Sequence, residues 1–169
     1  MTHEVAPIIK LAELESPSVI MMSGVPGSGK SYLAEQLGSL LHIPVISSDA
    51  IREEISGDAD NQEVSAEAWQ LLYNRVEHSI RDQQTIIVDA THALREYRIS
   101  DIKRYRLYGA QSVVAANVLT TRETALNRNA SRTQHVVPVE TIERMYASLA
   151  SNPPRLLDGF DVVVNLQND

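Results

Sequence analysis

The chain has 169 residues, of which 43% are hydrophobic, which is enough for one globular domain with a full apolar core. It contains no cysteine, which excludes a disulfide framework and thiol catalysis, and no apolar run approaches the roughly 20 residues of a membrane span. The net charge of −7 argues against a general nucleic-acid coat, and the first residues lack a signal-peptide pattern, so we expect a cytoplasmic protein with no membrane partner.

Strands and helices alternate along the chain. Residues 1–17 form an N-terminal extension, and residues 18–169 are predicted to form a single domain. The apolar runs predict strands near 18–23, 45–47, 85–89, 113–119 and 160–166. The segments with helical periodicity predict helices near 30–41, 49–55, 65–82, 94–108, 121–132 and 138–150. This alternation indicates an α/β fold, a five-stranded parallel sheet with helices on both faces, whose ligands bind at the carboxyl ends of the strands.

A glycine-rich loop follows the first predicted strand. Its sequence GVPGSGKS fits the phosphate-binding pattern GxxxxGK[ST] and precedes a predicted helix. Backbone N–H groups of such a loop point at phosphate oxygens, and we expect Lys30 to reach the β- and γ-phosphates and the Ser31 hydroxyl to ligate Mg²⁺. The predicted cofactors are therefore ATP and Mg²⁺. The residues predicted to bind the nucleotide here are Gly24, Pro26, Gly27, Ser28, Gly29, Lys30, Ser31 and Tyr32.

Asp49 follows the second predicted strand, and Arg52 lies three residues further on, on the same face of a predicted helix. A kinase that phosphorylates a hydroxyl group benefits from a carboxylate that accepts the hydroxyl proton and orients the oxygen. Arg52 is then placed to hold a negatively charged acceptor. The alternative is that Asp49 caps the helix and Arg52 lies on the surface; the spacing alone leaves both open.

Asp89 ends the third predicted strand, as the aspartate of a Walker B strand does. That position predicts support of Mg²⁺, often through a water molecule; the alternative is a turn or cap at the strand end. We favour the metal because this strand should neighbour the strand before the glycine loop. Thr91 and His92 come next, and although either is placed to touch an acceptor, for His92 we favour a plain loop residue.

Three arginines, Arg122, Arg128 and Arg132, gather in one helical segment with Glu123 as its only acidic residue. Arginines on a closing lid stabilise the charge on a transferring phosphate and exclude water. We therefore expect a helical lid with Arg128 and Arg132 on the nucleotide. Arg132 is the best catalytic candidate because it lies where the helix gives way to a loop. The alternative is an exposed basic helix.

Basic charge is concentrated in one part of the chain. Residues 92–132 carry 8 Lys and Arg against 3 Asp and Glu, a net charge of +5, whereas residues 1–91 carry 5 against 14, a net charge of −9. Five of these cations fall in the helix predicted near 94–108: Arg95, Arg98, Lys103, Arg104 and Arg106. They either line a groove for a phosphate backbone or belong to a solvated helix face, and the sequence favours neither.

Taken together, these residues resemble the 5′-hydroxyl kinase domain of polynucleotide kinases, a P-loop kinase family of bacteriophage and bacterial end-healing and RNA-repair enzymes. The resemblance covers about residues 19–150. It rests on the following segments: GVPGSGKS (24–31), ISSDAIR (46–52), IVDATH (87–92), RNASRT (128–133), VP (137–138) and RMY (144–146). Two positions depart from the family pattern, because Tyr32 stands where Thr is usual and His92 stands where Asn is usual.

The resemblance implies a role for each matching residue. Lys30 and Ser31 are implied to bind phosphates and metal, and Asp49 is implied to be the general base for the 5′-hydroxyl group. Arg52 is implied to contact the phosphate on the 3′ side of the acceptor nucleotide, and Arg132 the donor phosphates. The catalytic set is thus Lys30, Asp49, Arg52 and Arg132. Related enzymes also carry phosphatase or ligase domains, so repair partners with those activities are a further expectation.

Three functions follow from these patterns. The first is ATP-dependent phosphorylation of the 5′-hydroxyl of an RNA or DNA end. The second is a small-molecule kinase for a nucleoside, sugar or antibiotic, which the acidic net charge favours. The third, a non-catalytic ATP-binding module, is disfavoured by the intact catalytic set. An open basic channel that ends at Asp49 favours the first function, and a closed pocket of roughly a few hundred Å³ favours the second.

Overall fold

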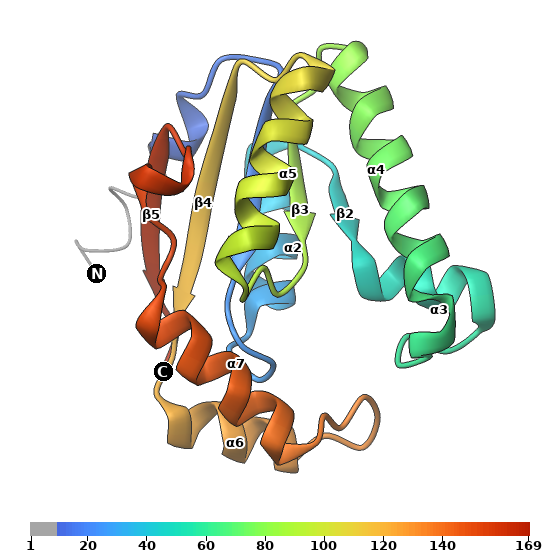
Figure 1. Ribbon diagram of the computed structural model, residues 1–169, viewed down its shortest axis with the longest axis vertical. Helices are drawn as coiled ribbons and strands as arrows, with labels where there is room; N and C mark the ends of the chain where they lie inside the picture. The colour runs from blue at the N-terminus through green and yellow to red at the C-terminus, as the bar shows by residue number, and fades with distance from the viewer. Residues whose placement is uncertain (1–9) are drawn as a thin grey trace.

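The computed structural model describes residues 10–169 and contains one five-stranded parallel sheet in the order β2-β3-β1-β4-β5 (Figure 1). The strands are β1 (Ser18–Ser23), β2 (Val45–Ser47), β3 (Ile86–Asp89), β4 (Ser112–Leu119) and β5 (Val162–Gln167). The α/β architecture and all five predicted strands are confirmed. The strand that leads into the glycine loop, β1, lies at the centre of the sheet with β3 and β4 beside it.

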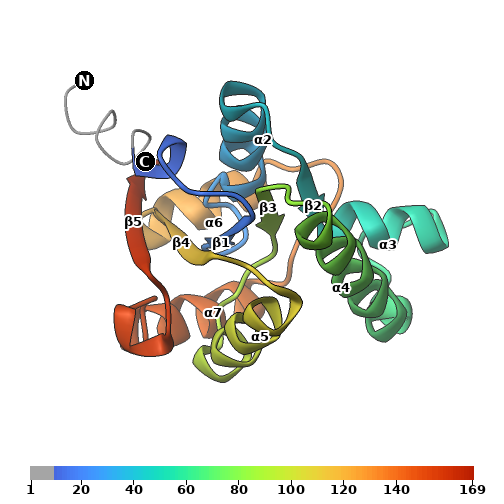
Figure 2. The ribbon, with the colours of Figure 1, turned by 90° about the horizontal axis from the view of Figure 1, so that it is seen from above.

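Six helices of the described region connect these strands, and their bounds lie within a few residues of the predicted ones. They are α2 (Lys30–Leu41), α3 (Ser48–Ser56), α4 (Ser65–Arg81), α5 (Arg95–Tyr108), α6 (Arg122–Ala130) and α7 (Val139–Ser151), with 3₁₀ turns η1 (Gln62–Val64) and η2 (Leu156–Asp158). Helix α2 covers one face of the sheet, and α4 and α5 cover the other (Figure 2). No helix of residues 10–169 is long and apolar enough to cross a membrane.

The central strand β1 contributes side chains to the hydrophobic cores on both faces of the sheet. Val19 and Met21 pack with α4 and α5, whereas the alternate residues Ile20 and Met22 pack with α2. Successive side chains of a strand point to opposite faces, so a strand covered on both sides is apolar throughout. This explains the unbroken apolar run in the sequence, and it holds the end of β1 rigidly at the carboxyl edge of the sheet.

The helix ends follow local sequence signals. The Thr121 side chain accepts a hydrogen bond from the Thr124 N–H at the start of α6, and Gly109 ends α5 in the left-handed conformation. Helix α3 is capped by Ser47, whose hydroxyl accepts from the Ala50 N–H at 3.4 Å. The alternative interpretation of Asp49 as the helix cap is therefore wrong, because Ser47 already occupies that position.

Only part of the predicted N-terminal extension belongs to the described residues, since residues 1–9 lie outside them. Within the remainder, Leu11 is buried in the core beneath α2, and the Pro17 carbonyl accepts a hydrogen bond from the Gln111 N–H at 2.7 Å. Residues 10–17 thus pack against the domain that they precede.

Candidate active site

The segments that follow the strands meet at the carboxyl edge of the sheet, across which α6 and α7 lie (Figure 1). They enclose a cavity of about 680 Å³. Of the predicted site residues, the following line it: Pro26, Gly27, Gly29, Lys30, Ser31, Tyr32, Asp49, Arg52 and Arg132. Gly24, Ser28, Asp89 and Arg128 are not among the lining residues. Trp69 of α4 and Arg144 of α7, which the sequence analysis did not single out as site residues, also line it.

The glycine loop has the conformation that a phosphate cradle needs. Gly27 and Gly29 have φ angles of 86° and 81°, which side chains rarely adopt. A Cβ atom on Gly27 would lie 2.2 Å from the carbonyl oxygen of Ala125 in α6, so this glycine also allows α6 to pack closely against the glycine loop. Helix α2 begins at Lys30 without a side-chain cap. Its first N–H groups are thus available to an anion, as a helix N-terminus favours.

Lys30 and Asp89 form a buried pair behind the cradle. The Lys30 Nζ atom lies 3.3 Å from Asp89 Oδ1, and the two side chains are 10% and 4% exposed. Asp89 ends β3, directly beside β1. Its Oδ1 atom accepts no hydrogen bond although it is buried. Its charge is balanced by Lys30, and carboxylate oxygens are also the ligands that a hard cation such as Mg²⁺ prefers.

Asp49 presents its carboxylate to the cavity, and Arg52 fixes it there. Arg52 Nη1 lies 2.5 Å from Asp49 Oδ1, and the Asp49 side chain is 65% exposed against 12% for Arg52. Arg52 Nε also donates to the Ser65 hydroxyl at the start of α4, at 3.4 Å. The aspartate is therefore held in place yet open to a ligand, as a group that receives a proton must be.

The three lid arginines have three different environments. Arg132 lies in the loop between α6 and α7, donates from Nη1 to the His135 carbonyl at 3.2 Å and lines the cavity. Arg128 donates to the Asn168 carbonyl at 2.8 Å beyond the end of β5. Arg122 pairs with Glu143 and ties α6 to α7. Of the three, Arg132 is the one whose side chain faces the cavity.

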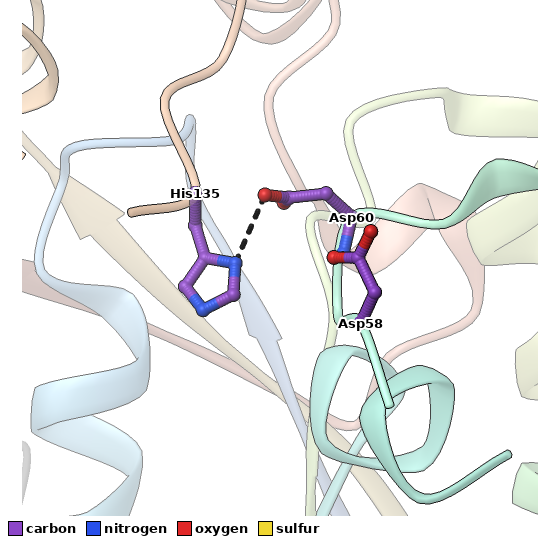
Figure 3. A group of neighbouring side chains, drawn as sticks. All are labelled: Asp58, Asp60 and His135. Carbon is purple, nitrogen blue, oxygen red and sulfur yellow. Dashed lines mark hydrogen bonds and ion pairs between the residues drawn. The ribbon is translucent and has the colours of Figure 1, made fainter. Parts of the chain in front are cut away.

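The loop between α6 and α7 contacts the opposite wall of the cavity through an ion pair. His135 Nδ1 lies 3.0 Å from Asp60 Oδ2, in the segment between α3 and η1 (Figure 3). Asp58 lies beside the pair, and ligand atoms of the three residues fall within 4.8 Å of one another. All three are exposed, so water screens their charges. The pair bridges two walls that are 75 residues apart in the sequence.

In helix α5 the buried Arg98 contradicts both interpretations of the basic segment. Arg98 is fully buried, with Nη2 3.1 Å from Asp158 Oδ2, and it donates to the backbone carbonyls of His92, Ala93 and Asn152. Burial lowers the pKa of Arg98, and the bonds to Asp158 oppose that shift. Arg95 also pairs with Asp158, and Arg106 with Asp161. These arginines hold the C-terminal segment onto α5, and none of them lines the cavity. Arg98 fits neither interpretation, whereas Arg95, Lys103 and Arg106 are exposed, as the interpretation of a solvated helix face expects.

His92 is also not a plain loop residue, contrary to the expectation. Its side chain is buried, and Nδ1 donates to the Met22 carbonyl at 2.5 Å. Burial lowers the pKa of His92, and burial raises the pKa of its neighbour Asp101. The Gly24 N–H donates to the Thr91 carbonyl at 3.2 Å. The loop after β3 is thereby fastened to the start of the glycine loop, so His92 acts as a structural anchor.

Comparisons with known proteins agree with this arrangement. Residues 19–151 match the model of a family described as an AAA domain (AAA_33). No curated protein matches the sequence.

Similar solved structures include a proposed kinase from Chloroflexus aurantiacus (TM-score 0.71, 19% identity, covering 91% of this chain and 86% of that one). They also include a chain of the Pnkp1/Rnl/Hen1 RNA repair complex (TM-score 0.72, 22% identity, 90% of this chain and 49% of that one). A third is a gluconokinase from Sinorhizobium meliloti (TM-score 0.60, 20% identity, covering 92% of this chain and 85% of that one). At these identities the likeness establishes the kinase-like P-loop fold alone.

Proposed function

The chain belongs to this AAA domain family, and we propose that it is an ATP-dependent kinase that transfers the γ-phosphate to a hydroxyl group. One observation carries the proposal. A single cavity is lined by the glycine loop with Lys30, by Asp49, and by the lid residue Arg132. These are the three parts that phosphoryl transfer to a hydroxyl group requires: a phosphate cradle, a proton acceptor and a cation on the transferring charge.

The residues divide the reaction between them. The acceptor oxygen forms a bond to the γ-phosphorus as the bond to the β–γ bridging oxygen breaks, and ADP leaves with that oxygen. Asp49 takes the proton of the hydroxyl group. Lys30 and Arg132 neutralise charge on the transferred phosphate. Mg²⁺, with Ser31 and Asp89 as its protein-side oxygens, supplies further neutralisation of the phosphates when bound.

The first candidate acceptor is the 5′-hydroxyl of an RNA or DNA end. It is supported by the pairing of Asp49 with Arg52, which presents a proton acceptor and a cation side by side at the cavity wall. In this interpretation Arg52 contacts the phosphate that follows the terminal nucleoside. The known complex that contains a similar structure is an RNA repair complex, so partners with phosphatase or ligase activity are part of this proposal.

The second candidate is a small molecule such as a nucleoside, sugar or antibiotic, and two observations favour it. The cavity volume of about 680 Å³ lies within the range of roughly 300–1,000 Å³ that small-molecule sites occupy. In addition, the arginines expected to form a basic channel are bonded to Asp158 and Asp161, and a hollow beside the cavity is lined by Glu53, Asp58 and Asp60. Carboxylates there repel a long phosphate backbone.

The deciding experiment is transfer of labelled γ-phosphate from ATP·Mg²⁺ to a short 5′-hydroxyl oligonucleotide, with a 5′-phosphorylated copy as control. Label on the first alone supports the polynucleotide acceptor, and RNA and DNA copies then give its preference. No label on either, from a protein that binds ATP, leads to a panel of nucleosides, sugars and antibiotics. A protein that binds ATP and labels nothing in that panel contradicts the kinase proposal.

A further inference from the structure

Trp69 is the single tryptophan of the chain, and it is not one of the residues proposed to bind or transfer the phosphate. It lies on α4, is partly buried, and lines the same cavity as Asp49 and Lys30. An indole placed at the wall of a polar phosphate-transfer site offers a large flat apolar surface to a ligand. Trp69 is therefore placed to contact part of a substrate bound in this cavity.

The wall that leads from Asp49 to Trp69 is continuous. Arg52 Nη1 lies 2.5 Å from Asp49, and its Nε donates to the Ser65 hydroxyl at 3.4 Å. Ser65 and Trp69 are four residues apart on α4, so they share one face and are separated by about one turn, roughly 5.4 Å along the axis. The indole thus belongs to the acceptor side of the cavity, about one helical turn beyond the group that fixes the proposed base.

The indole is held in a fixed orientation by its neighbours. The Tyr73 ring packs against it with centroids 5.6 Å apart, and the His92 ring meets it edge-on at 6.4 Å. Tyr73 is itself fixed, because its hydroxyl donates to Asp101 at 2.8 Å and the Arg104 guanidinium lies 4.1 Å from its ring centroid. A rigid aromatic surface loses little conformational entropy when a ligand stacks on it, which favours binding.

We propose that Trp69 is the platform on which a planar ring of the acceptor stacks. The ring is the nucleobase of a nucleoside whose 5′-hydroxyl is directed to Asp49, either free or at the end of a strand. This inference rests on the proposed function and deepens it. Stacking on an aromatic side chain tolerates every base, because each base has a flat π-face.

The lid supplies apolar contacts to the same cavity. Val137, Pro138 and Met145 line it together with Trp69. Methionine adapts its shape to flat partners, so it suits a ring held between the lid and the indole. The neighbouring hollow is lined by the acidic residues Glu53, Asp58 and Asp60, which repel phosphate groups. We therefore expect the protein to recognise the first nucleoside of an acceptor and not a long strand.

Intrinsic fluorescence tests the platform without any turnover, because Trp69 is the only source of the tryptophan signal. The protein is first saturated with a non-hydrolysable ATP analogue and Mg²⁺, so that the donor site is filled. It is then titrated with a nucleoside, a short 5′-hydroxyl oligonucleotide and ribose, with correction for absorbance. We expect a saturable quench with the base-bearing compounds and none with ribose. A quench at lower concentration with the oligonucleotide identifies a strand end, and equal potency identifies a free nucleoside.

Kinetics of variants supply the second measurement. Trp69→Ala is expected to lower kcat/KM for the acceptor by about 10-fold or more and to leave the KM for ATP within about twofold, whereas Trp69→Phe keeps most activity. Tyr97→Ala removes an exposed aromatic ring on α5, outside the cavity lining, and is the matched control. Equal losses for ATP and acceptor in Trp69→Ala, or the same loss in Tyr97→Ala, overturn the platform.

The two proposals fail in distinguishable ways. Transfer to a nucleoside or oligonucleotide without any fluorescence response overturns the platform and leaves the kinase proposal standing. A ring-dependent quench in a protein that transfers phosphate to no hydroxyl group supports the platform as a binding site and overturns the kinase proposal. Transfer to ribose-like compounds alone, without response to bases, also overturns the platform.

Discussion

Helix α5 and the lid, residues 122–151, are two arginine-bearing regions of the molecule, and Arg98 of the first and Arg132 of the second have opposite environments. In α5 the arginines meet aspartates of the C-terminal segment, and Arg98 is buried with Asp158. In the lid, Arg132 bonds to a backbone carbonyl of its own loop and faces the cavity. Arg122 of the lid pairs with Glu143 and in this respect resembles the arginines of α5. Arg132 forms no ion pair among the described residues, so its charge is available to a ligand.

The largest expected effect lies on the α5 side of this comparison. Arg98→Ala removes the buried partner of the Asp158 carboxylate and leaves it only the half-exposed Arg95, so we expect the free energy of unfolding to fall by about 3 kcal/mol. Urea denaturation followed by circular dichroism measures this. Lys103→Ala removes an exposed cation from the same helix and should change stability by less than about 0.5 kcal/mol. Equal stability of the two variants would contradict the structural role of Arg98.

On the cavity side, Lys30→Ala is expected to lower phosphate transfer by about 10³-fold, because the cation proposed to neutralise the transferring phosphate is lost. Steady-state transfer of labelled phosphate measures the rate, and circular dichroism checks that the fold survives. Transfer at the wild-type rate would remove the glycine loop from the mechanism.

Arg132→Ala is the direct counterpart of Arg98→Ala. We expect kcat to fall by at least about 10²-fold while the unfolding midpoint stays unchanged, since the side chain forms no ion pair within the described fold and serves charge developing on phosphate. Single-turnover kinetics and urea denaturation provide the two readings. A loss of stability without loss of rate would place Arg132 with the scaffold arginines instead.

Asp49→Asn tests whether Asp49 acts as a general base or only supports the structure of the site. Its amide keeps the shape but does not take a proton, so transfer should fall by at least about 10²-fold with ATP affinity little changed. The rate comes from labelled transfer and the affinity from calorimetry with a non-hydrolysable ATP analogue. If affinity and rate fall together, Asp49 supports the nucleotide or metal and another group takes the proton.

The smallest effect is expected at the lid contact between His135 and Asp60. Exposed ion pairs contribute about 1 kcal/mol or less, so His135→Ala should raise the KM of the acceptor by no more than about fivefold, and less at high salt. Asp60→Asn should have the same effect, and the double variant no more than either single one. Additive effects in that cycle would show that the two residues act separately.

Much of the site was predictable because its signals are local. The glycine loop is eight consecutive residues between a strand and a helix, and Asp49 and Arg52 are three residues apart on one helix. Over such distances, backbone geometry fixes which side chains share a face. Of the strand order, only the pairing of β3 with β1 was predicted, and it is confirmed. The carboxyl-edge rule for parallel sheets was enough to bring these residues to one cavity.

Other parts were hidden from the sequence because their partners are distant. Arg98 and Asp158 are 60 residues apart, and nothing near either one marks the pairing. On α4 the side chains of Leu72, Val76 and Ile80 are buried, whereas Trp69 is partly buried and lines the cavity, a difference that helical periodicity does not reveal. His92 was read as a loop residue because burial of a loop is decided by what packs over it.

The sequence by itself therefore determined the helices, the strands, the glycine loop and the spacing of Asp49 and Arg52, since each depends on the pattern of residues close together in the chain. Only the tertiary structure decided which arginines are free for a ligand, which aromatic ring meets the cavity and which loop is anchored to the cradle. Those outcomes depend on desolvation and on partners brought together from far along the chain, and a charged side chain has no fixed role until that environment exists.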